Sequence, residues 1–350
     1  MMDRKRGAAA ALALAAAVVF TLPAAAQTID GLPNQSPRAS VSQTIGITQV
    51  TIDYHRPAVN GRNVWGGLVP YGTVWRAGAN DNTTIHFTHP VKIEGKDLAA
   101  GTYGLHMLPT EETWTIIFSQ NSTSWGSFSY DEKEDALRVT VRPEESPFEE
   151  WLSYRFDDLG NDGATVALYW EELRVPFAVE VDTHAAVLTM IRQQLRHLPG
   201  FTWQGWNSAA AYAAQHAINL EEALTWSDRS IGIERNANNL LTKAAILDHL
   251  NRGEEAEALR SEALAMANEG QINAMGYQAL ARGDVDRAIE LFKKNVADHP
   301  ESWNTYDSLA EGYRNKGETQ LSIEFYTKAL EMAPEAQKPR IQAILDDMKK

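Results

Sequence analysis

Residues 305–334 read TYDSLAEGYRNKGETQLSIEFYTKALEMAP, and this stretch decides the fold of the C-terminal half of the chain. Its distinctive residues have counterparts 34 positions earlier in the sequence. The matched pairs are Gly283 and Gly317, Pro300 and Pro334, Phe292 and Tyr326, Gly276 and Ala310, and Ala288 and Ser322. An internal repeat of this length, with a glycine between two apolar helical patterns, predicts stacked helix–turn–helix units.

This repeat resembles the tetratricopeptide repeat (TPR), which has the same period. In the second copy the resemblance implies that Ala310 lies at the close contact between the paired helices. It also implies that Tyr313 is the neighbouring aromatic and that Gly317 forms the turn. The first copy has Ala279 where that aromatic is expected. The residues that define the two copies are Gly276, Gly283, Ala288, Phe292, Pro300, Ala310, Tyr313, Gly317, Tyr326, Ala329 and Pro334.

Weaker copies of the repeat precede these two. One is centred on Gly253, and another has Asn219 at its turn. Repeats of this kind need about three neighbours to bury a continuous core, so we expect an all-α TPR-like array over residues 183–350. Stacked helix pairs leave a long groove, which predicts that the array binds a protein or peptide partner.

Upstream of residue 183 the apolar period is two. The segment VTIDYH, residues 50–55, places Val50, Ile52 and Tyr54 on one face, and the segments TTIHFTH and TYGLHML continue the alternation. Such strands, separated by turn sequences such as EGK and GNDG, predict an antiparallel all-β sandwich over residues 41–182. Residues 27–40 are rich in Pro, Asn and Ser and are predicted to be a flexible leader.

The first residues follow the order of a secretory signal. A basic segment, residues 3–6, precedes an apolar run, residues 8–22, and three alanines stand before Gln27. This order predicts a signal peptide, residues 1–26, and an exported, periplasmic protein. No later run reaches the length of a membrane span, so we expect none after cleavage.

The chain of 350 residues carries a formal net charge of −14 and no cysteine. Nucleic-acid affinity comes largely from Lys and Arg that neutralise phosphates, so this charge argues against nucleic acid as a partner. Without cysteine the protein has neither disulfides nor a thiol nucleophile, and its stability depends on its core.

Residues 56–84, RPAVNGRNVWGGLVPYGTVWRAGANDNTT, form the most unusual segment of the β domain. Long ordered loops on a β scaffold often carry function. The candidate ligand-binding residues are Arg56, Arg62, Trp75, Arg76 and Asn80. Their arginines either pair with a carboxylate such as Asp53 or Asp81, or bind an anionic ligand. The alternative is that the loop is a structural plug whose rings bury apolar area.

Two further site types are open. His55, His86 and His106 lie on the polar faces of predicted strands, where they either hold a metal ion or are ordinary surface histidines. Aromatic residues at the loops either stack on sugars or plug the end of the sandwich. These aromatics are Trp65, Tyr71, Trp75, Trp125, Phe128 and Tyr130.

The β domain, residues 36–182, resembles the bacterial domain of unknown function 2911 family (DUF2911). The pattern RP…GR…LVPYG…WR.GAN within residues 56–80 carries the resemblance. It implies an exported domain that often stands alone or precedes TPR repeats, and it implies no activity. The matching residues are Arg56, Pro57, Gly61, Arg62, Leu68, Val69, Pro70, Tyr71, Gly72, Trp75, Arg76, Gly78, Ala79 and Asn80.

No phosphate-binding loop, dinucleotide fingerprint, HExxH zinc motif or nucleophile elbow occurs in the sequence, and no catalytic residue or cofactor is predicted. We therefore expect an exported, non-enzymatic binding and scaffold protein. The alternative is that the β domain is an uncharacterised enzyme, or a metal- or carbohydrate-binding module.

Overall fold

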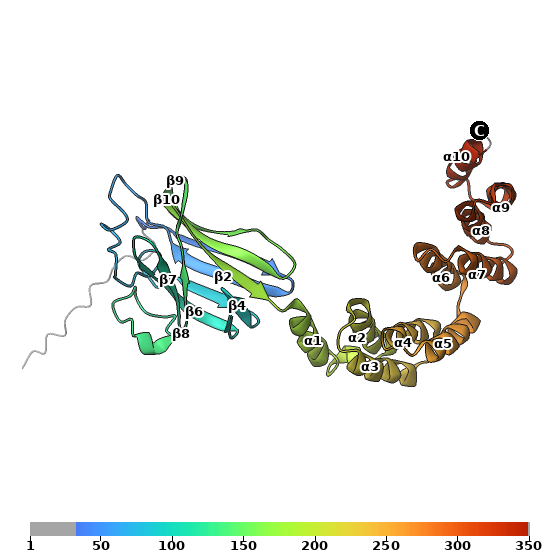
Figure 1. Ribbon diagram of the computed structural model, residues 1–350, viewed down its shortest axis with the longest axis horizontal. Helices are drawn as coiled ribbons and strands as arrows, with labels where there is room; N and C mark the ends of the chain where they lie inside the picture. Colours follow the sequence, from blue (N-terminus) through green and yellow to red (C-terminus); the bar gives the residue numbers. More distant parts are fainter. Residues whose placement is uncertain (1–32, 349–350) are drawn as a thin grey trace, which may run out of the picture. The chain divides into compact units, whose positions relative to one another are not determined.

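The computed structural model describes residues 33–348 and divides the chain into two compact units, with the boundary after Ala186. Strands dominate the first unit and helices the second, as Figure 1 shows. The predicted order, an all-β domain followed by an all-α repeat domain, is confirmed. The predicted signal peptide, residues 1–26, and residues 27–32 of the predicted leader lie outside the described residues.

One sheet of the first unit has six antiparallel strands in the order β1-β2-β3-β6-β7-β8. The other has four antiparallel strands in the order β5-β4-β10-β9. The bounds of the six are β1 Arg38–Ile45, β2 Thr48–His55, β3 Thr84–Phe87, β6 Gly101–Pro109, β7 Trp114–Ser119 and β8 Asp135–Val141. Those of the four are β4 Val91–Ile93, β5 Lys96–Leu98, β9 Glu144–Asp157 and β10 Gly163–Val181.

The two sheets enclose one hydrophobic core. Buried residues alternate with more exposed ones along β2 and β3, so one face of each strand turns inward. A single cluster of buried side chains draws on both sheets. The rings of Phe118 in β7 and Phe177 in β10, for example, meet at a centroid distance of 5.9 Å.

The first strand begins earlier than the sequence predicts. Strand β1 starts at Arg38, within the range assigned to the flexible leader, and pairs with β2 from Arg38 opposite His55 to Ile45 opposite Thr48. The hydrogen bonds of this ladder hold residues 38–40 although their composition is polar. The leader prediction is therefore wrong for these three positions.

Residues 56–83 connect β2 to β3 and join the two sheets. Near its start this loop pairs with the four-stranded sheet, where Ala58 lies opposite Trp151 of β9. Further on it pairs with the six-stranded sheet, where the Trp75 N–H donates to the Met107 carbonyl of β6 at 2.8 Å. The loop is therefore an ordered part of the sandwich.

Within residues 33–348, ten α-helices follow the strands. They are α1 Thr183–Gln194, α2 Trp203–His216, α3 Leu220–Ile233, α4 Ala237–His249, α5 Gly253–Met266, α6 Glu269–Ala281, α7 Val285–Asp298, α8 Trp303–Lys316, α9 Thr319–Met332 and α10 Lys338–Met348. Among residues 33–348, no helix combines the length and the apolarity needed to cross a membrane.

The repeat-defining residues occupy the predicted roles. Gly283 and Gly317 have φ of 80° and 82°, a left-handed conformation that ends α6 and α8 with little strain for glycine. Seven of the others are buried between helices. They are Gly276, Ala288, Phe292, Ala310, Tyr313, Tyr326 and Ala329.

Two upstream details differ from the sequence-based expectation. In the first copy Tyr277 supplies the missing aromatic, because its ring centroid lies 5.3 Å from that of Phe292. Ala279, at the position where an aromatic was expected, is buried. In the copy around Gly253, Asn251 takes the left-handed turn position with φ of 60°, and Gly253 is the first residue of α5.

Candidate functional site

A pocket of about 400 Å³ opens beside residues 56–83 in the first unit, and we call it the loop pocket. Four of the predicted ligand-binding residues line it, namely Arg62, Trp75, Arg76 and Asn80. Arg56 does not, because its Nε donates to the Leu152 carbonyl of β9 at 2.8 Å. The remaining walls include Ser36, Trp125 and Trp170, which come from distant parts of the sequence.

Four tryptophans pack together next to this pocket. Trp65 and Trp75 come from the loop, Trp114 from β7 and Trp170 from β10, with ring centroids 5.0–6.5 Å apart. Trp114 and Trp170 are each 1% exposed. The loop is therefore a plug that closes the core, as one alternative predicted, and the same loop also lines a pocket.

Backbone carbonyls, rather than carboxylates, hold the pocket arginines. Arg62 donates through Nε to the Val59 carbonyl at 3.1 Å and through Nη2 to the Ala58 carbonyl at 2.5 Å. Arg76 donates through Nη1 to the Asn80 carbonyl at 2.7 Å. Within residues 33–348, neither arginine forms an ion pair.

Of the two alternatives for these arginines, pairing with Asp53 or Asp81 does not occur. Asp53 faces Arg38 instead, at 3.5 Å, because the β1–β2 register brings those two side chains together. Two cationic groups therefore line the loop pocket without a neutralising carboxylate.

Arg76 also contacts two rings at the rim of the pocket. Its Cζ lies 5.5 Å from the ring centroid of Trp125 and 5.4 Å from that of Phe128, within the range of a cation–π contact. The two rings stack on each other at 5.7 Å and are 62% and 79% exposed. Burial lowers the pKa of Arg76 from its ordinary value, although the group remains charged.

Asn80 has a different part in the site from the one expected. Its side-chain amide donates to Asn34 Oδ1 at 3.2 Å and to the Ser36 carbonyl at 3.4 Å, so it ties the segment before β1 to the pocket rim. Its backbone is left-handed, with φ of 57°, a conformation that asparagine tolerates better than most residues. Its carbonyl in turn receives the Arg76 guanidinium.

His106 forms a hydrogen-bonded pair with Ser127, a contact that the sequence did not suggest. The two side chains meet at 2.8 Å, from Nδ1 to Oγ. Burial, and secondly the positive charge of Arg76, lower the pKa of His106 to about 4. A general base works best with a pKa near the working pH, so this histidine is a poor activator of the serine.

The three histidines proposed as metal ligands are not brought together. His86 is paired with Thr102 across β3 and β6, at 2.8 Å between side chains, and His106 lies four residues further along β6. His55 is at the end of β2. In the part of the chain that the structure describes, no group of three or more His, Asp or Glu side chains is placed to hold a metal ion. The prediction placed the three histidines on polar strand faces, but it did not include how far apart they lie along the strands.

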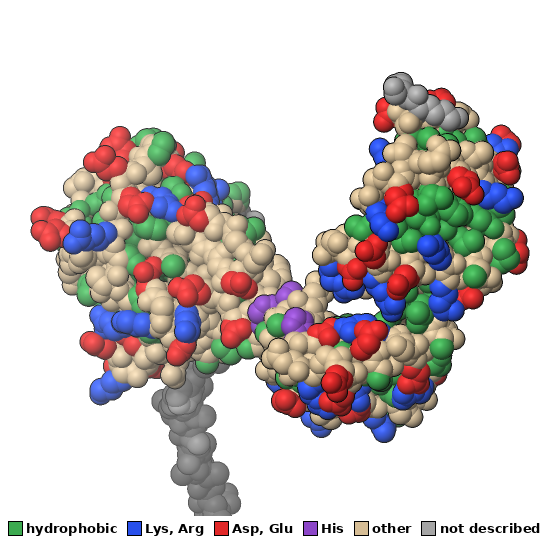
Figure 2. Space-filling model, turned by 45° about the vertical axis from the view of Figure 1, so that its right-hand side comes forward, with side chains coloured by type: hydrophobic (Ala, Val, Ile, Leu, Met, Phe, Trp, Pro, Cys, Tyr) green, Lys and Arg blue, Asp and Glu red, His purple; other side chains and the backbone are tan. Residues whose placement is uncertain are grey.

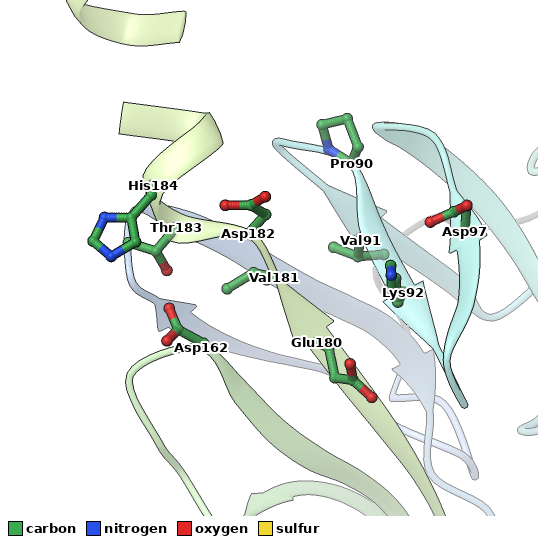
Figure 3. A pocket seen from close by; sticks show the side chains of 10 residues that line it. All are labelled: Pro90, Val91, Lys92, Asp97, Asp162, Glu180, Val181, Asp182, Thr183 and His184. Atoms are coloured by element: carbon green, nitrogen blue, oxygen red, sulfur yellow. The ribbon is translucent and has the colours of Figure 1, made fainter. Parts of the chain in front are cut away.

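A second pocket of about 450 Å³ lies near the end of β10 and is rich in carboxylates. Figure 3 shows that Asp97 and Asp162 stand on opposite sides of it rather than converging. Asp182 accepts the Ala185 N–H at 2.8 Å and so caps the start of α1. This contact gives Asp182 a structural role.

In the second unit, the first helices of successive pairs lie beside one another. Contacts join α2 to α4 and α6 to α8, while Gln271 of α6 donates to Asn238 of α4 at 2.8 Å. Tyr277 of α6 donates to Glu311 Oε2 of α8 at 2.7 Å. Figure 2 shows hydrophobic side chains gathered among acidic and basic ones on the helices towards the C-terminus. We call the surface of α2, α4, α6, α8 and α10 the first-helix face.

Two family models match parts of the chain. Residues 36–179 match the family model of the protein of unknown function DUF2911, and residues 305–340 match a tetratricopeptide repeat model. The layout predicted from the sequence, a DUF2911 domain followed by TPR repeats, is thus confirmed. No curated protein matches the chain.

Several solved structures match the chain, and each of those named here covers under half of it. MamA is 16% identical over 44% of this chain and 83% of its own, with a TM-score of 0.30. The pilF protein of Pseudomonas aeruginosa is 15% identical over 42% and 67%, with a TM-score of 0.30. YrrB, described as a TPR protein with an unusual peptide-binding site, is 13% identical over 45% and 83%, with a TM-score of 0.29.

Proposed function

We propose that this is an exported, non-enzymatic binding and scaffold protein whose helical repeats bind a protein or peptide partner. The β domain carries a second binding site, the loop pocket beside Arg62 and Arg76. The basic, apolar and small-residue order of residues 1–26 supports export to the periplasm. The low pKa of His106, which hydrogen-bonds the Ser127 hydroxyl, makes it a poor general base and supports a non-enzymatic role.

One observation carries the role of the repeats: the first helices of successive pairs lie beside one another, and we call the set of equivalent positions on them the column. Its members recur every 32 to 34 residues, one from each helix of the first-helix face. They are Asn207, Leu241, Asn273, Asp307 and Arg340. Repeat proteins use such extended surfaces for binding, because each repeat adds one set of side chains to the same face.

The chemistry of the column suits an extended peptide. Near its C-terminal end it contains Asp307, which is buried and paired with Arg340, and one turn further along α8 it presents the half-buried Glu311. Burial raises the pKa of Asp307, and Arg340 of α10 offsets part of this by pairing with it at 2.8 Å. A pocket of about 110 Å³ beside Leu241 offers room for a side chain of the partner. We expect a partner with cationic or N–H donor groups opposite α8.

Site-specific photo-crosslinking in exporting cells tests this function. A benzoylphenylalanine at Glu311, on the first-helix face, is expected to form a discrete adduct with a protein partner. The matched control replaces Glu324 of α9, an exposed glutamate on the second helix of the same repeat, and is expected to form none. The adduct is measured by immunoblot and identified by mass spectrometry.

Equal adducts at both positions would indicate non-specific collision and contradict the proposal. Absence of any adduct at Glu311 and at a second position on the face, Asn304 of α8, would also contradict it. Fractionation of the same cells locates the protein, and retention in the cytoplasm would refute export.

A further inference from the structure

We propose that the loop pocket binds an oxyanion, a carboxylate or phosphate group, carried on an apolar or aromatic body. This inference rests on the proposed second binding site and gives it a ligand class. Four features of the pocket support it, namely unpaired cations, a positive local field, an unsatisfied buried donor and exposed stacked rings.

The first feature is the contrast between the pocket arginines and others in the same unit. Arg138 and Arg174 form ion pairs with Asp135 and Asp157, at 3.2 and 3.0 Å. The protein carries an excess of acidic residues, with a net charge of −14, yet none of those within residues 33–348 forms an ion pair with Arg62 or Arg76. The carbonyl hydrogen bonds of these two arginines fix their positions and leave most of their N–H groups for a ligand.

The second feature is electrostatic. The charge of Arg76 contributes to the low pKa of His106, so an imidazole beside the pocket is held neutral by a positive field as well as by burial. An anion in the pocket would meet a charged guanidinium and no competing carboxylate. Hydrogen bonds between a guanidinium and an oxyanion are among the stronger ones in proteins.

The third feature is a buried donor without an acceptor. Trp170 lines the pocket and is 1% exposed, and its indole N–H has no hydrogen-bond partner within residues 33–348. Leaving such a buried donor without an acceptor destabilises the folded protein. By contrast, the indole N–H of Trp75 donates to the Gly78 carbonyl at 3.1 Å. An oxyanion only accepts hydrogen bonds, so it would supply the acceptor that the Trp170 N–H does not have.

The fourth feature defines the rest of the ligand. Trp125 and Phe128 are stacked and exposed at the rim, while Trp75 and Trp170 are stacked at 6.0 Å in the wall. Exposed aromatic rings beside a cation provide apolar area that a ligand body would cover. A volume of about 400 Å³ lies within the range of small-molecule pockets.

Isothermal titration calorimetry on the purified mature protein tests the inference. The probes are phenyl phosphate, benzoate, and benzamide as the neutral analogue of benzoate. A short peptide that ends in phenylalanine, with either a free or an amidated carboxyl group, separates a chain terminus from a free acid as the source of the anion. We expect saturable binding of an anionic probe that benzamide and the amidated peptide do not show.

Substitutions identify the site. Arg62→Gln and Arg76→Gln are each expected to weaken anion binding about 10-fold or more, the loss typical of a charge-assisted hydrogen bond. Trp170→Phe keeps an aromatic ring and removes the N–H, and is expected to weaken anion binding by a smaller factor. Arg142→Gln removes the same charge from an exposed position outside the pocket and should leave binding unchanged.

Unchanged melting temperatures show that each variant is folded, and Arg76→Lys keeps the charge if Arg76→Gln is unstable. Equal binding of benzamide and benzoate, no binding of any anion, or full affinity in both arginine variants would overturn the inference. None of these outcomes would alter cross-linking at Glu311, so failure here is distinguishable from failure of the helical binding role.

Discussion

Phe292 is fully buried in the helical unit, and its ring lies directly over Gly276 of α6. A Cβ placed on Gly276 would meet that ring at 2.3 Å, well inside van der Waals contact. The small residue of the repeat pattern therefore allows two helices to approach. The same pair of positions in the next copy, Ala310 and Tyr326, has room for one methyl group.

Substitution of Gly276 tests this packing. Gly276→Ala is expected to lower the free energy of unfolding of the helical unit by about 1–3 kcal/mol, the usual cost of overpacking. Gly270→Ala, in the same helix, meets only an Asn268 side-chain atom at 3.6 Å and should cause little change. Urea unfolding followed by far-UV circular dichroism measures both. Equal stability of the two variants would contradict the role of Gly276.

His106 makes the stability of the β unit depend on pH. An exposed histidine has a pKa near 6.5, whereas burial and then Arg76 lower that of folded His106 to about 4. The unfolded state therefore binds more protons between these values, and stability falls as the pH drops through this window. Since His106 is 2% exposed, the shift corresponds to about 3 kcal/mol lost at the lower end.

This dependence is measured by thermal unfolding between pH 7 and pH 5, compared with the His106→Gln variant. The variant is expected to lose less stability over that range than the wild type, whereas His86→Gln, which removes a ring from the same sheet, keeps the wild-type slope. Parallel pH curves for wild type and His106→Gln would refute the assignment. Titration of the His106 ring above pH 6 by NMR would do so too.

At the scale of elements, the loop 56–83 behaves as part of the sandwich because four tryptophans hold it. Trp65 and Trp75 of the loop pack on Trp114 of β7 and Trp170 of β10. The loop thereby closes one end of the core and also forms a wall of the pocket. The many glycines and prolines of the loop therefore allow its ordered course between the two sheets and do not make it mobile.

Removing one of these rings should release the loop. Trp114→Ala is expected to destabilise the β unit by about 3–5 kcal/mol, the usual loss for a fully buried large ring. Trp125→Ala removes an exposed ring and is expected to change stability by less than about 0.5 kcal/mol. Chemical unfolding and limited proteolysis within residues 56–83 measure the two effects. Similar losses for both variants would contradict the cluster's role.

At the scale of the whole molecule, the chain consists of two units with separate cores. The β unit has one large buried cluster, while the helical unit has several smaller ones, each shared by neighbouring repeats. This difference follows from architecture, because a sandwich buries a single layer between sheets and a repeat array buries only contacts between neighbours. The two proposed binding functions are accordingly assigned to different units.

The sequence by itself determined both fold classes, the repeat period and the loop that forms the candidate site. The period of two residues specifies strands with one buried face, and the period of 34 residues specifies stacked helix pairs, so both can be read without knowing the tertiary structure. Arg62, Trp75, Arg76 and Asn80 were identified from the same stretch, and they do line one pocket.

Only the tertiary structure decided what those residues meet. The register of β3 and β6 places His86 and His106 apart along the strands. The register of β1 and β2 pairs Asp53 with Arg38, so Asp53 does not pair with the pocket arginines. Trp170 reaches the pocket, and Ser127 reaches His106, from segments outside the loop. Contacts of this kind depend on how strands are ordered and aligned across sheets, and no local pattern in the sequence encodes that alignment.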